Sequence, residues 1–312
     1  MKVWIYPPCP EKLPEALKSR LPSLEIIVSE DEIPDADIVV GNPSTELLKR
    51  NAALKLIQLR SAGTGNFPSL IRERPEVRLC CATGAYGHAV AEHMFSALLT
   101  IMKRLDGYAV QQKSRVWNDL GPAGTIRGAN VLVLGLGNIG GEFGKMAMAL
   151  GAHVTGFRRI PTSSPECAHE VFSLESLERY LGNADVIAMA LPDTPETKNV
   201  LSRERFALIK KGAYIVNAGR GSAIDEDALC DALESGAIAA ASVDVTRIEP
   251  LPKNHRLWNA RNLLITPHIS GGDHLPDIAE NLIAITCSNV NALINGGEFT
   301  SLVDPGTGYR AR

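Results

Sequence analysis

The chain has 312 residues, of which 45% are hydrophobic and 21% charged, with a mean hydropathy of +0.00. This apolar content excludes disorder for the bulk of the chain, and the length favours about two domains. A formal net charge of −3 gives no basic excess, so nucleic acid is not expected as a partner.

No apolar stretch reaches the ~18 residues of a membrane span. The best candidate, residues 89–102, is interrupted by Glu92 and His93, and the N-terminus lacks the apolar core of a secretory signal. We therefore expect a cytoplasmic protein without a membrane partner.

The six cysteines, at positions 9, 80, 81, 167, 230 and 287, show no metal-ligand spacing. The adjacent pair Cys80 and Cys81 leaves no room for the usual disulfide geometry. Free thiols and no metal site are expected.

Two series of short apolar runs predict the strands. The first lies at residues 2–6, 24–28, 37–41, 55–60 and 77–80, with helix-like segments between the runs. The second, more strongly apolar, lies at residues 130–134, 153–157, 184–190, 213–217, 238–243 and 262–266. Nearly continuous apolar strands that alternate with helices predict an α/β fold with two doubly wound parallel-sheet domains.

Two long helices are expected outside these series. Residues 89–105 are apolar around most of the helix, which must be buried in the core or against a partner. The helix at about 275–293 follows the final strand and is expected to pack on the first domain. A shorter helix is marked by an N-cap at Asp225 and a C-terminal glycine, Gly236.

A glycine-rich turn follows the first strand of the second series. Residues 130–141 read NVLVLGLGNIGG, which places Gly135, Gly137 and Gly140 between a strand and a helix. We expect Gly135 to form the tight turn, Gly137 to admit a pyrophosphate and Gly140 to allow close packing. The sequence therefore predicts a dinucleotide site at this helix N-terminus, which also includes Asn138 and Ile139; the alternative is a turn without ligand.

The next strand ends in Arg158 and Arg159, where NAD sites usually carry an acidic residue for the ribose hydroxyl. A guanidinium there can pair with a 2′-phosphate instead. The expected cofactor is therefore NADP, with NAD possible, and Arg158 is the first candidate. The alternative is that both arginines are solvated loop charges.

Three later loops bring polar residues to the carboxyl edge of the second sheet, where open α/β sheets bind ligands. Residues 217–221 carry Arg220, residues 246–250 carry Glu249, and residues 266–270 carry His268. Arg220 can bind a carboxylate, and His268 can exchange a proton with the carbonyl oxygen of a substrate being reduced. Glu249 can orient the histidine ring and favour its protonated form.

The motifs VLVLGLGNIGG, LPDTPETK, NAGRG, DVTRIEPLP and TPHIS, in this order, resemble the D-isomer-specific 2-hydroxyacid dehydrogenases. The match is specific over residues 131–272 and looser over residues 54–303. The resemblance implies the same roles for Arg220, Glu249 and His268. Because the NAD-type aspartate is missing, the chain is most similar to the NADP-preferring, glyoxylate-reductase-like branch.

The resemblance also implies further contacts. The backbone of Ser61, Ala62 and Gly63 would hold the substrate carboxylate, and Asp244 would contact the nicotinamide amide. Tyr86 is a weaker substrate candidate whose alternative role is packing in a hinge loop, and His88 nearby has no assigned role. The other cofactor contacts that the resemblance implies are Leu191, Pro192, Thr197, Ala218, Gly219 and Gly271.

The fold implied is a Rossmann dinucleotide-binding domain, residues 88–283, inserted in a flavodoxin-like substrate domain of residues 1–87 and 284–312. The helix at 89–105 resembles a segment used for homodimer contact. The sequence thus predicts an NADPH-preferring enzyme that interconverts small 2-oxo and 2-hydroxy acids. Two alternatives stay open: a non-catalytic dinucleotide-sensing interaction protein, and a short phospho-hydroxyacid dehydrogenase.

Overall fold

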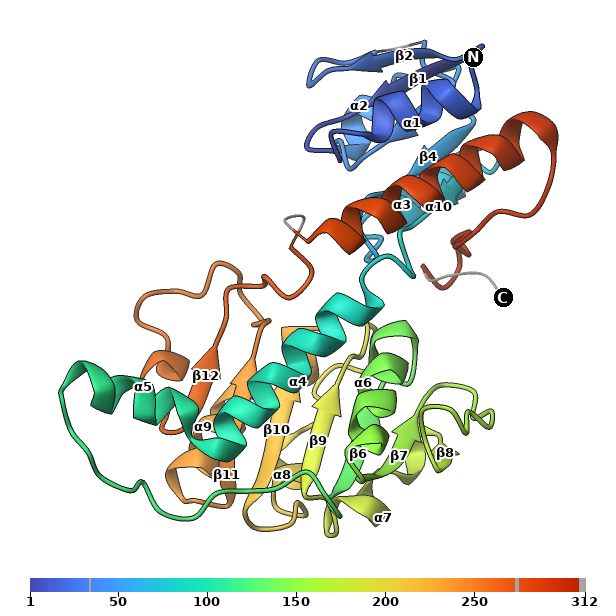
Figure 1. The fold of residues 1–312 in the computed structure, drawn as a ribbon. Helices are drawn as coiled ribbons and strands as arrows, with labels where there is room; N and C mark the ends of the chain where they lie inside the picture. The colour runs from blue at the N-terminus through green and yellow to red at the C-terminus, as the bar shows by residue number, and fades with distance from the viewer. Residues whose placement is uncertain (34, 273–274, 309–312) are drawn as a thin grey trace. The chain divides into compact units, whose positions relative to one another are not determined.

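The structure is a computed structural model that describes residues 1–33, 35–272 and 275–308. The chain divides into two compact units (Figure 1): Met1–Tyr86 with the chain from Gly272 onward form unit 1, and Gly87–Gly271 form unit 2. The first expected boundary, 87/88, falls next to this division. The second, 283/284, would fall inside α10, Pro276–Asn295, a continuous helix that belongs whole to unit 1.

Unit 1 is built on a parallel sheet with the strand order β2-β1-β3-β4-β5, which is the flavodoxin-like order. Its strands are β1 (Lys2–Ile5), β2 (Glu25–Val28), β3 (Ile38–Val40), β4 (Leu56–Gln58) and β5 (Arg78–Cys80). One core cluster joins the sheet to α1 (Leu13–Arg20) and α10. A second joins it to α2 (Thr45–Lys49) and α3 (Phe67–Glu73), so helices cover both faces.

Unit 2 is built on a larger parallel sheet with the order β12-β11-β10-β9-β6-β7-β8. Its strands are β6 (Asn130–Leu134), β7 (His153–Phe157), β8 (Glu170–Phe172), β9 (Val186–Met189), β10 (Ala213–Asn217), β11 (Ile238–Val243) and β12 (Leu263–Ile265). The chain proceeds outward from β6 to β8, returns to β9 and continues to β12. This is the Rossmann order, so the expected fold class is confirmed.

The apolar helix of the sequence is α4, Gly87–Lys103, and it is buried within unit 2. It packs against α6 (Asn138–Ala149) and against β10, β11 and β12 (Figure 1). Its buried positions include Val90, Met94, Phe95, Leu98 and Met102. The core, rather than a partner, therefore accounts for most of the apolar surface of this helix.

The remaining helices of unit 2 are shorter. They are α5 (Leu105–Lys113), α7 (Glu178–Leu181), α8 (Arg203–Phe206) and α9 (Glu226–Glu234), with 3-10 turns η1 (Leu174–Ser176), η2 (Gly221–Ala223) and η3 (Arg256–Asn259). The expected caps of α9 are confirmed: the Asp225 carboxylate accepts the Ala228 amide hydrogen at 3.0 Å, and Gly236 has φ +71°. In the described part of the chain, no helix has the length and apolarity needed to span a membrane.

All six cysteines are free thiols in this structure, and every one except Cys9 is buried. Burial raises the pKa of Cys80 to about 12, so this thiol stays protonated at neutral pH.

Candidate active site

The glycine-rich turn lies where the strand order of unit 2 reverses, between β6 and β9. Gly135 has φ +96°, and a Cβ on it would lie 2.6 Å from the carbonyl oxygen of Ala190, which follows β9. A Cβ on Gly140 would lie 2.2 Å from the carbonyl oxygen of Gly135. Close backbone packing therefore requires glycine at both positions.

Gly137 differs from its neighbours in the turn. A Cβ on it would meet no atom of the protein within 4 Å, and its φ of −100° lies in the range open to other residues. Gly137 is the N-cap of α6, and no side chain caps this helix end. The space beside Gly137 and the uncapped helix N-terminus fit the pyrophosphate of a dinucleotide.

The arginine pair follows β7, the neighbour of β6. The amide of Arg158 donates to the carbonyl oxygen of Phe172 at 3.0 Å, and its guanidinium lies 3.5 Å from Oγ of Ser164. Arg158 is half-buried, whereas Arg159 is exposed. Of the two arginines after β7, Arg158 is therefore the one whose side chain contacts the rest of unit 2.

The loop after β9 contains the predicted residues Leu191, Pro192 and Thr197. Leu191 and Thr197 are buried, and Pro192 is exposed. The hydroxyl of Thr197 donates to the carbonyl oxygen of Pro192 at 2.6 Å and accepts the amide hydrogen of Thr194. In this structure Thr197 thus holds the shape of the loop through its own hydrogen bonds.

Arg220 lies on the loop after β10, which the side chain of Asn217 shapes. Nδ2 of Asn217 donates to the carbonyl oxygen of Arg220 at 3.1 Å, and Oδ1 accepts the amide hydrogen of Gly219 at 3.0 Å. Ala218 is buried, and a Cβ on Gly219 would lie 2.6 Å from the backbone of Leu191. Because the guanidinium is half-buried and donates to the Gly219 carbonyl oxygen at 2.7 Å, its position is defined.

Glu249 and His268 form the closest side-chain pair at this sheet edge among the predicted residues. Nδ1 of His268 lies 2.7 Å from Oε2 of Glu249, and Oε1 accepts the amide hydrogen of Thr246 at 3.0 Å. About half of the His268 side chain is exposed, at 50%. The carboxylate thus fixes the ring while leaving it open to a ligand.

The backbone at His268 is left-handed, with φ +53°. This conformation costs a residue other than glycine roughly 1–2 kcal/mol, so the surrounding structure must maintain it. The His268 amide donates to the carbonyl oxygens of Asp244 at 2.8 Å and of Thr266 at 3.1 Å.

Asp244 is buried and faces the same loop. Oδ1 accepts hydrogen bonds from the Thr266 hydroxyl at 2.6 Å and the Ile269 amide at 3.0 Å, and Oδ2 accepts from the Ser270 amide at 3.0 Å. Burial alone would raise the pKa of Asp244, but these donors lower it below the usual value. The family resemblance implied a nicotinamide contact; here the carboxylate anchors the loop that ends at Gly271.

The predicted substrate residues Ser61, Ala62 and Gly63 lie in unit 1, on the loop after β4. Oγ of Ser61 donates to the carbonyl oxygen of Gly63 at 2.6 Å and accepts from Nδ2 of Asn42 at 2.8 Å. Ala62, between them, is exposed. These bonds shape the loop whose backbone was expected to hold a carboxylate.

Tyr86 belongs to the same unit, and its hydroxyl donates to the carbonyl oxygen of Arg60. The structure thus supports a role in shaping the loop. Arg60 and Asn42 were not singled out in the sequence, although Arg60 ends one predicted strand and Asn42 follows another, so the sheet-edge argument could have found both.

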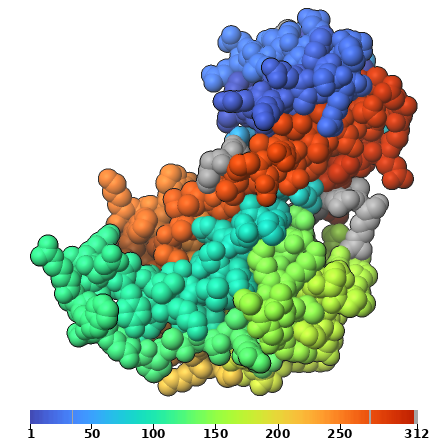
Figure 2. All heavy atoms as spheres, in the orientation of Figure 1, coloured from blue at the N-terminus to red at the C-terminus, as the bar shows by residue number. Residues whose placement is uncertain are grey.

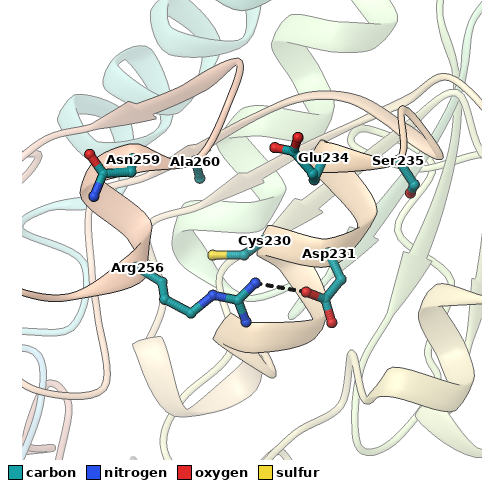
Figure 3. Close-up of a pocket in the computed structure, with 7 residues that line it drawn as sticks. All are labelled: Cys230, Asp231, Glu234, Ser235, Arg256, Asn259 and Ala260. Carbon is teal, nitrogen blue, oxygen red and sulfur yellow. Dashed lines mark hydrogen bonds and ion pairs between the residues drawn. The ribbon is translucent and has the colours of Figure 1, made fainter.

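A hollow lies away from these residues, between α9 and η3 (Figure 3). It has a volume of about 510 Å³ and is lined by Cys230, Asp231, Glu234, Ser235, Arg256, Asn259 and Ala260. Arg256 pairs with Asp231 at 2.8 Å, and no predicted site residue lines the hollow. Within the described ranges, no cluster of three or more His, Cys, Asp or Glu side chains could hold a metal ion.

Comparison with known proteins identifies relatives over nearly the whole chain. The family model of the D-isomer specific 2-hydroxyacid dehydrogenase, NAD binding domain, matches residues 95–270. Glyoxylate/hydroxypyruvate reductase A of Serratia proteamaculans is 30% identical over 306 residues, which cover 94% of each chain.

Two further relatives are a longer protein and a solved structure. The chain is 31% identical to the D-3-phosphoglycerate dehydrogenase of Bacillus subtilis over 77% of its own length, but it spans only 46% of that protein. A D-isomer specific 2-hydroxyacid dehydrogenase of Xanthobacter autotrophicus, solved in complex with NADPH and MES, superimposes with a TM-score of 0.84 at 25% identity. That match covers 98% of this chain and 99% of the other.

The family model covers more than half of the chain, and the predicted dinucleotide turn and acid–base residues lie within its range. The Rossmann strand order of unit 2 agrees with it. The chain belongs to the D-isomer specific 2-hydroxyacid dehydrogenase family, whose members are NAD(P)-binding oxidoreductases.

Proposed function

We propose that the protein is an NADPH-preferring reductase of small 2-oxo acids, which it converts to D-2-hydroxy acids. The observation that carries this proposal is the 2.7 Å contact between Nδ1 of His268 and Oε2 of Glu249. A histidine oriented in this way and half exposed is a proton donor for a carbonyl oxygen. A sensing protein without catalysis has no need of this pair.

The residues that would hold the cofactor are in unit 2. The uncapped end of α6 beside Gly137 would bind the pyrophosphate, and the loops at Leu191 and Gly219 would line the rest of the site. When bound, a reduced nicotinamide supplies the hydride that adds to the carbonyl carbon.

The chain's own side chains then supply charge and a proton. Arg220 binds the carboxylate of the 2-oxo acid and fixes its orientation. Nε2 of His268 donates a proton to the carbonyl oxygen as that oxygen gains negative charge. Glu249 stabilises the imidazolium before the transfer, and in the reverse direction Nε2 of the neutral ring accepts the proton of the substrate hydroxyl.

Preference for NADPH rests on Arg158. Its half-buried guanidinium follows β7, where a ribose 2′-phosphate would lie, and the two residues directly after the strand are arginines rather than an aspartate or glutamate. The Xanthobacter relative binds NADPH in its solved structure, which supports the same choice here.

The functional form we propose is a homodimer that buries α5 and the loop after it. No residue of α5 is buried, Val110 is 65% exposed and Trp117 is 99% exposed. This segment lies on the surface of unit 2 (Figure 2). So much exposed apolar area is typical of an interface, and Val110→Glu combined with Trp117→Ala is expected to give a monomer in sedimentation velocity.

The reaction is tested by following absorbance at 340 nm with NADPH or NADH and glyoxylate, hydroxypyruvate, phosphorylated hydroxypyruvate, pyruvate, phenylpyruvate or 2-oxoisocaproate. Turnover with NADPH that His268→Ala abolishes supports the proposal. Turnover confined to a phosphorylated hydroxypyruvate would favour the phospho-hydroxyacid dehydrogenase instead. Tight NADPH binding without turnover on any of these acids would favour the dinucleotide-sensing protein.

A further inference from the structure

His93 is a side chain of α4 that contacts the loop carrying His268. Its Nε2 lies 3.1 Å from Oγ1 of Thr266, two residues before His268, and its side chain is 25% exposed. In the sequence His93 only interrupts an apolar helix, and the proposed reaction gives it no role.

The direction of the hydrogen bonds can be worked out from the groups involved. The hydroxyl of Thr266 has a single hydrogen, which it donates to Oδ1 of Asp244 at 2.6 Å. Its oxygen must then accept from His93, so Nε2 of His93 carries a hydrogen. His93 is thus the donor at the start of a chain that ends on a buried carboxylate.

Asp244 passes this constraint to the backbone of His268 and of the two residues that follow it. Its carboxylate accepts the amide hydrogens of Ile269 and Ser270, each at 3.0 Å, and its carbonyl oxygen accepts that of His268 at 2.8 Å. These bonds hold the left-handed backbone at His268, which would otherwise relax.

The hydrogen bonds to Asp244 matter because His268 follows β12, a strand that the sheet holds only weakly. β12 has three residues, lies at the edge of the sheet and is half-buried throughout. By contrast, α4 is a 17-residue helix with much of its surface in the core of unit 2, and it packs against β12. A side chain from α4 can therefore fix the loop after β12, which β12 itself holds only weakly.

We propose that His93 is a positioning residue for the acid–base centre: through Thr266 and Asp244 it fixes the backbone that aims the ring of His268. The inference rests on the proposed role of His268 in proton transfer. His93 itself touches neither substrate nor cofactor in this role. Its contribution is to the geometry of the reacting complex, so its loss should lower kcat and leave binding almost unchanged.

The test compares four single variants of the full chain and one double variant, His93→Leu with Thr266→Val. His93→Leu removes the donor, and His93→Gln keeps an amide donor at about the same reach. Thr266→Val removes the hydroxyl that joins His93 to Asp244. His88→Leu is the matched control, because His88 is also on α4 but its side chain is 59% exposed and pairs with two glutamates, away from Thr266.

We expect kcat of His93→Leu to fall about ten- to a hundredfold, with little change in KM for the 2-oxo acid or in the Kd for NADPH. His93→Gln should recover most of the loss, and His88→Leu should match the unaltered protein. In the Thr266→Val background, His93→Leu should cause no further loss, since both substitutions break one chain of bonds. Unchanged kcat in His93→Leu, or full additivity of the two substitutions, would overturn the proposal.

A second readout does not depend on turnover. In ¹H–¹⁵N spectra of the imidazole groups, the His268 signals, assigned with His268→Ala, should shift in His93→Leu and stay in place in His88→Leu. Nε2 of His93 should be protonated. If the protein reduces no 2-oxo acid, the proposed function fails, but these spectra still decide whether His93 is coupled to His268; unshifted His268 signals would show that it is not.

Discussion

Nδ1 of His268 lies 2.7 Å from Oε2 of Glu249, while the other oxygen of this carboxylate accepts the Thr246 amide hydrogen at 3.0 Å. Nδ1 is therefore committed to Glu249, and Nε2 is the ring atom left to exchange a proton with a substrate. The backbone bond from Thr246 keeps the carboxylate from rotating away. Because His268 exchanges the proton and Glu249 only holds the ring, the role of each residue can be tested by its own substitution.

His268→Ala should lower kcat for 2-oxo acid reduction about 10²- to 10⁴-fold, because a positioned proton donor contributes that much. The Kd for NADPH, measured by quenching of protein fluorescence, should change little, since no cofactor contact is assigned to this ring. Near-normal kcat would remove His268 from the reaction. Loss of NADPH binding would instead indicate a structural role.

Glu249→Gln should lower kcat about ten- to a hundredfold and alter KM little. The amide is uncharged, so it stabilises the imidazolium less, although it can still contact the ring. Steady-state kinetics beside Glu234→Gln provide the comparison, because Glu234 is an exposed carboxylate on α9 away from the predicted residues. Equal kcat in the two variants would contradict the role assigned to Glu249.

Substitutions at two glycines of the turn should affect different properties, one of them NADPH binding and the other the stability of the fold. A Cβ at Gly137 meets no protein atom within 4 Å, so Gly137→Ala should fold normally and weaken NADPH binding. A Cβ at Gly140 would lie 2.2 Å from the Gly135 carbonyl oxygen, so Gly140→Ala should lower the free energy of unfolding by about 1–3 kcal/mol. Urea unfolding measures the stability of each variant, and fluorescence titration measures its NADPH binding. Unimpaired NADPH binding by Gly137→Ala would show that the pyrophosphate binds elsewhere.

Much of the fold follows from patterns that act locally. Continuous apolar runs predicted β6, β7, β10 and β11 to the residue, because buried parallel strands expose little to solvent. The edge strand β8 was missed, since its three residues include a glutamate and are at most half-buried. An edge strand of this kind leaves almost no signal in the sequence.

The site was predictable where residues follow strands. Glu249 and His268 were expected together because parallel strands end at one sheet edge, and the structure brings them into contact. The orientation of the Asp244 carboxylate could not be predicted, because the amides that donate to it belong to Ile269 and Ser270, more than twenty residues further along the chain. His93 was missed because a helix position shows nothing about which distant loop it meets.

Arg158→Asp should raise the Kd for NADPH far more than that for NADH. A carboxylate at the end of β7 would repel the 2′-phosphate and could accept a hydrogen bond from the ribose hydroxyls of NADH. Arg159→Asp is the matched variant, because the Arg159 side chain is exposed and should matter less. The ratio of the two dissociation constants is the measurement. Equal weakening of both cofactors by Arg158→Asp would end the argument for phosphate recognition.

Asp244→Asn should lower the free energy of unfolding in a pH-dependent way. Burial opposes ionisation of Asp244, but its hydrogen-bond donors prevail and hold the pKa below the usual value of 3.8. A carboxyl group with a lowered pKa in the folded state stabilises the protein fully above its unfolded pKa, and this contribution is lost as pH falls through the folded pKa. The gap in free energy of unfolding between the unaltered protein and Asp244→Asn should therefore stay constant at about 2 kcal/mol near neutral pH. It should shrink below about pH 4. Urea unfolding between pH 3 and pH 7, with Glu234→Gln as control, measures this gap; a gap that does not change with pH would show that the charge of Asp244 does not hold the loop.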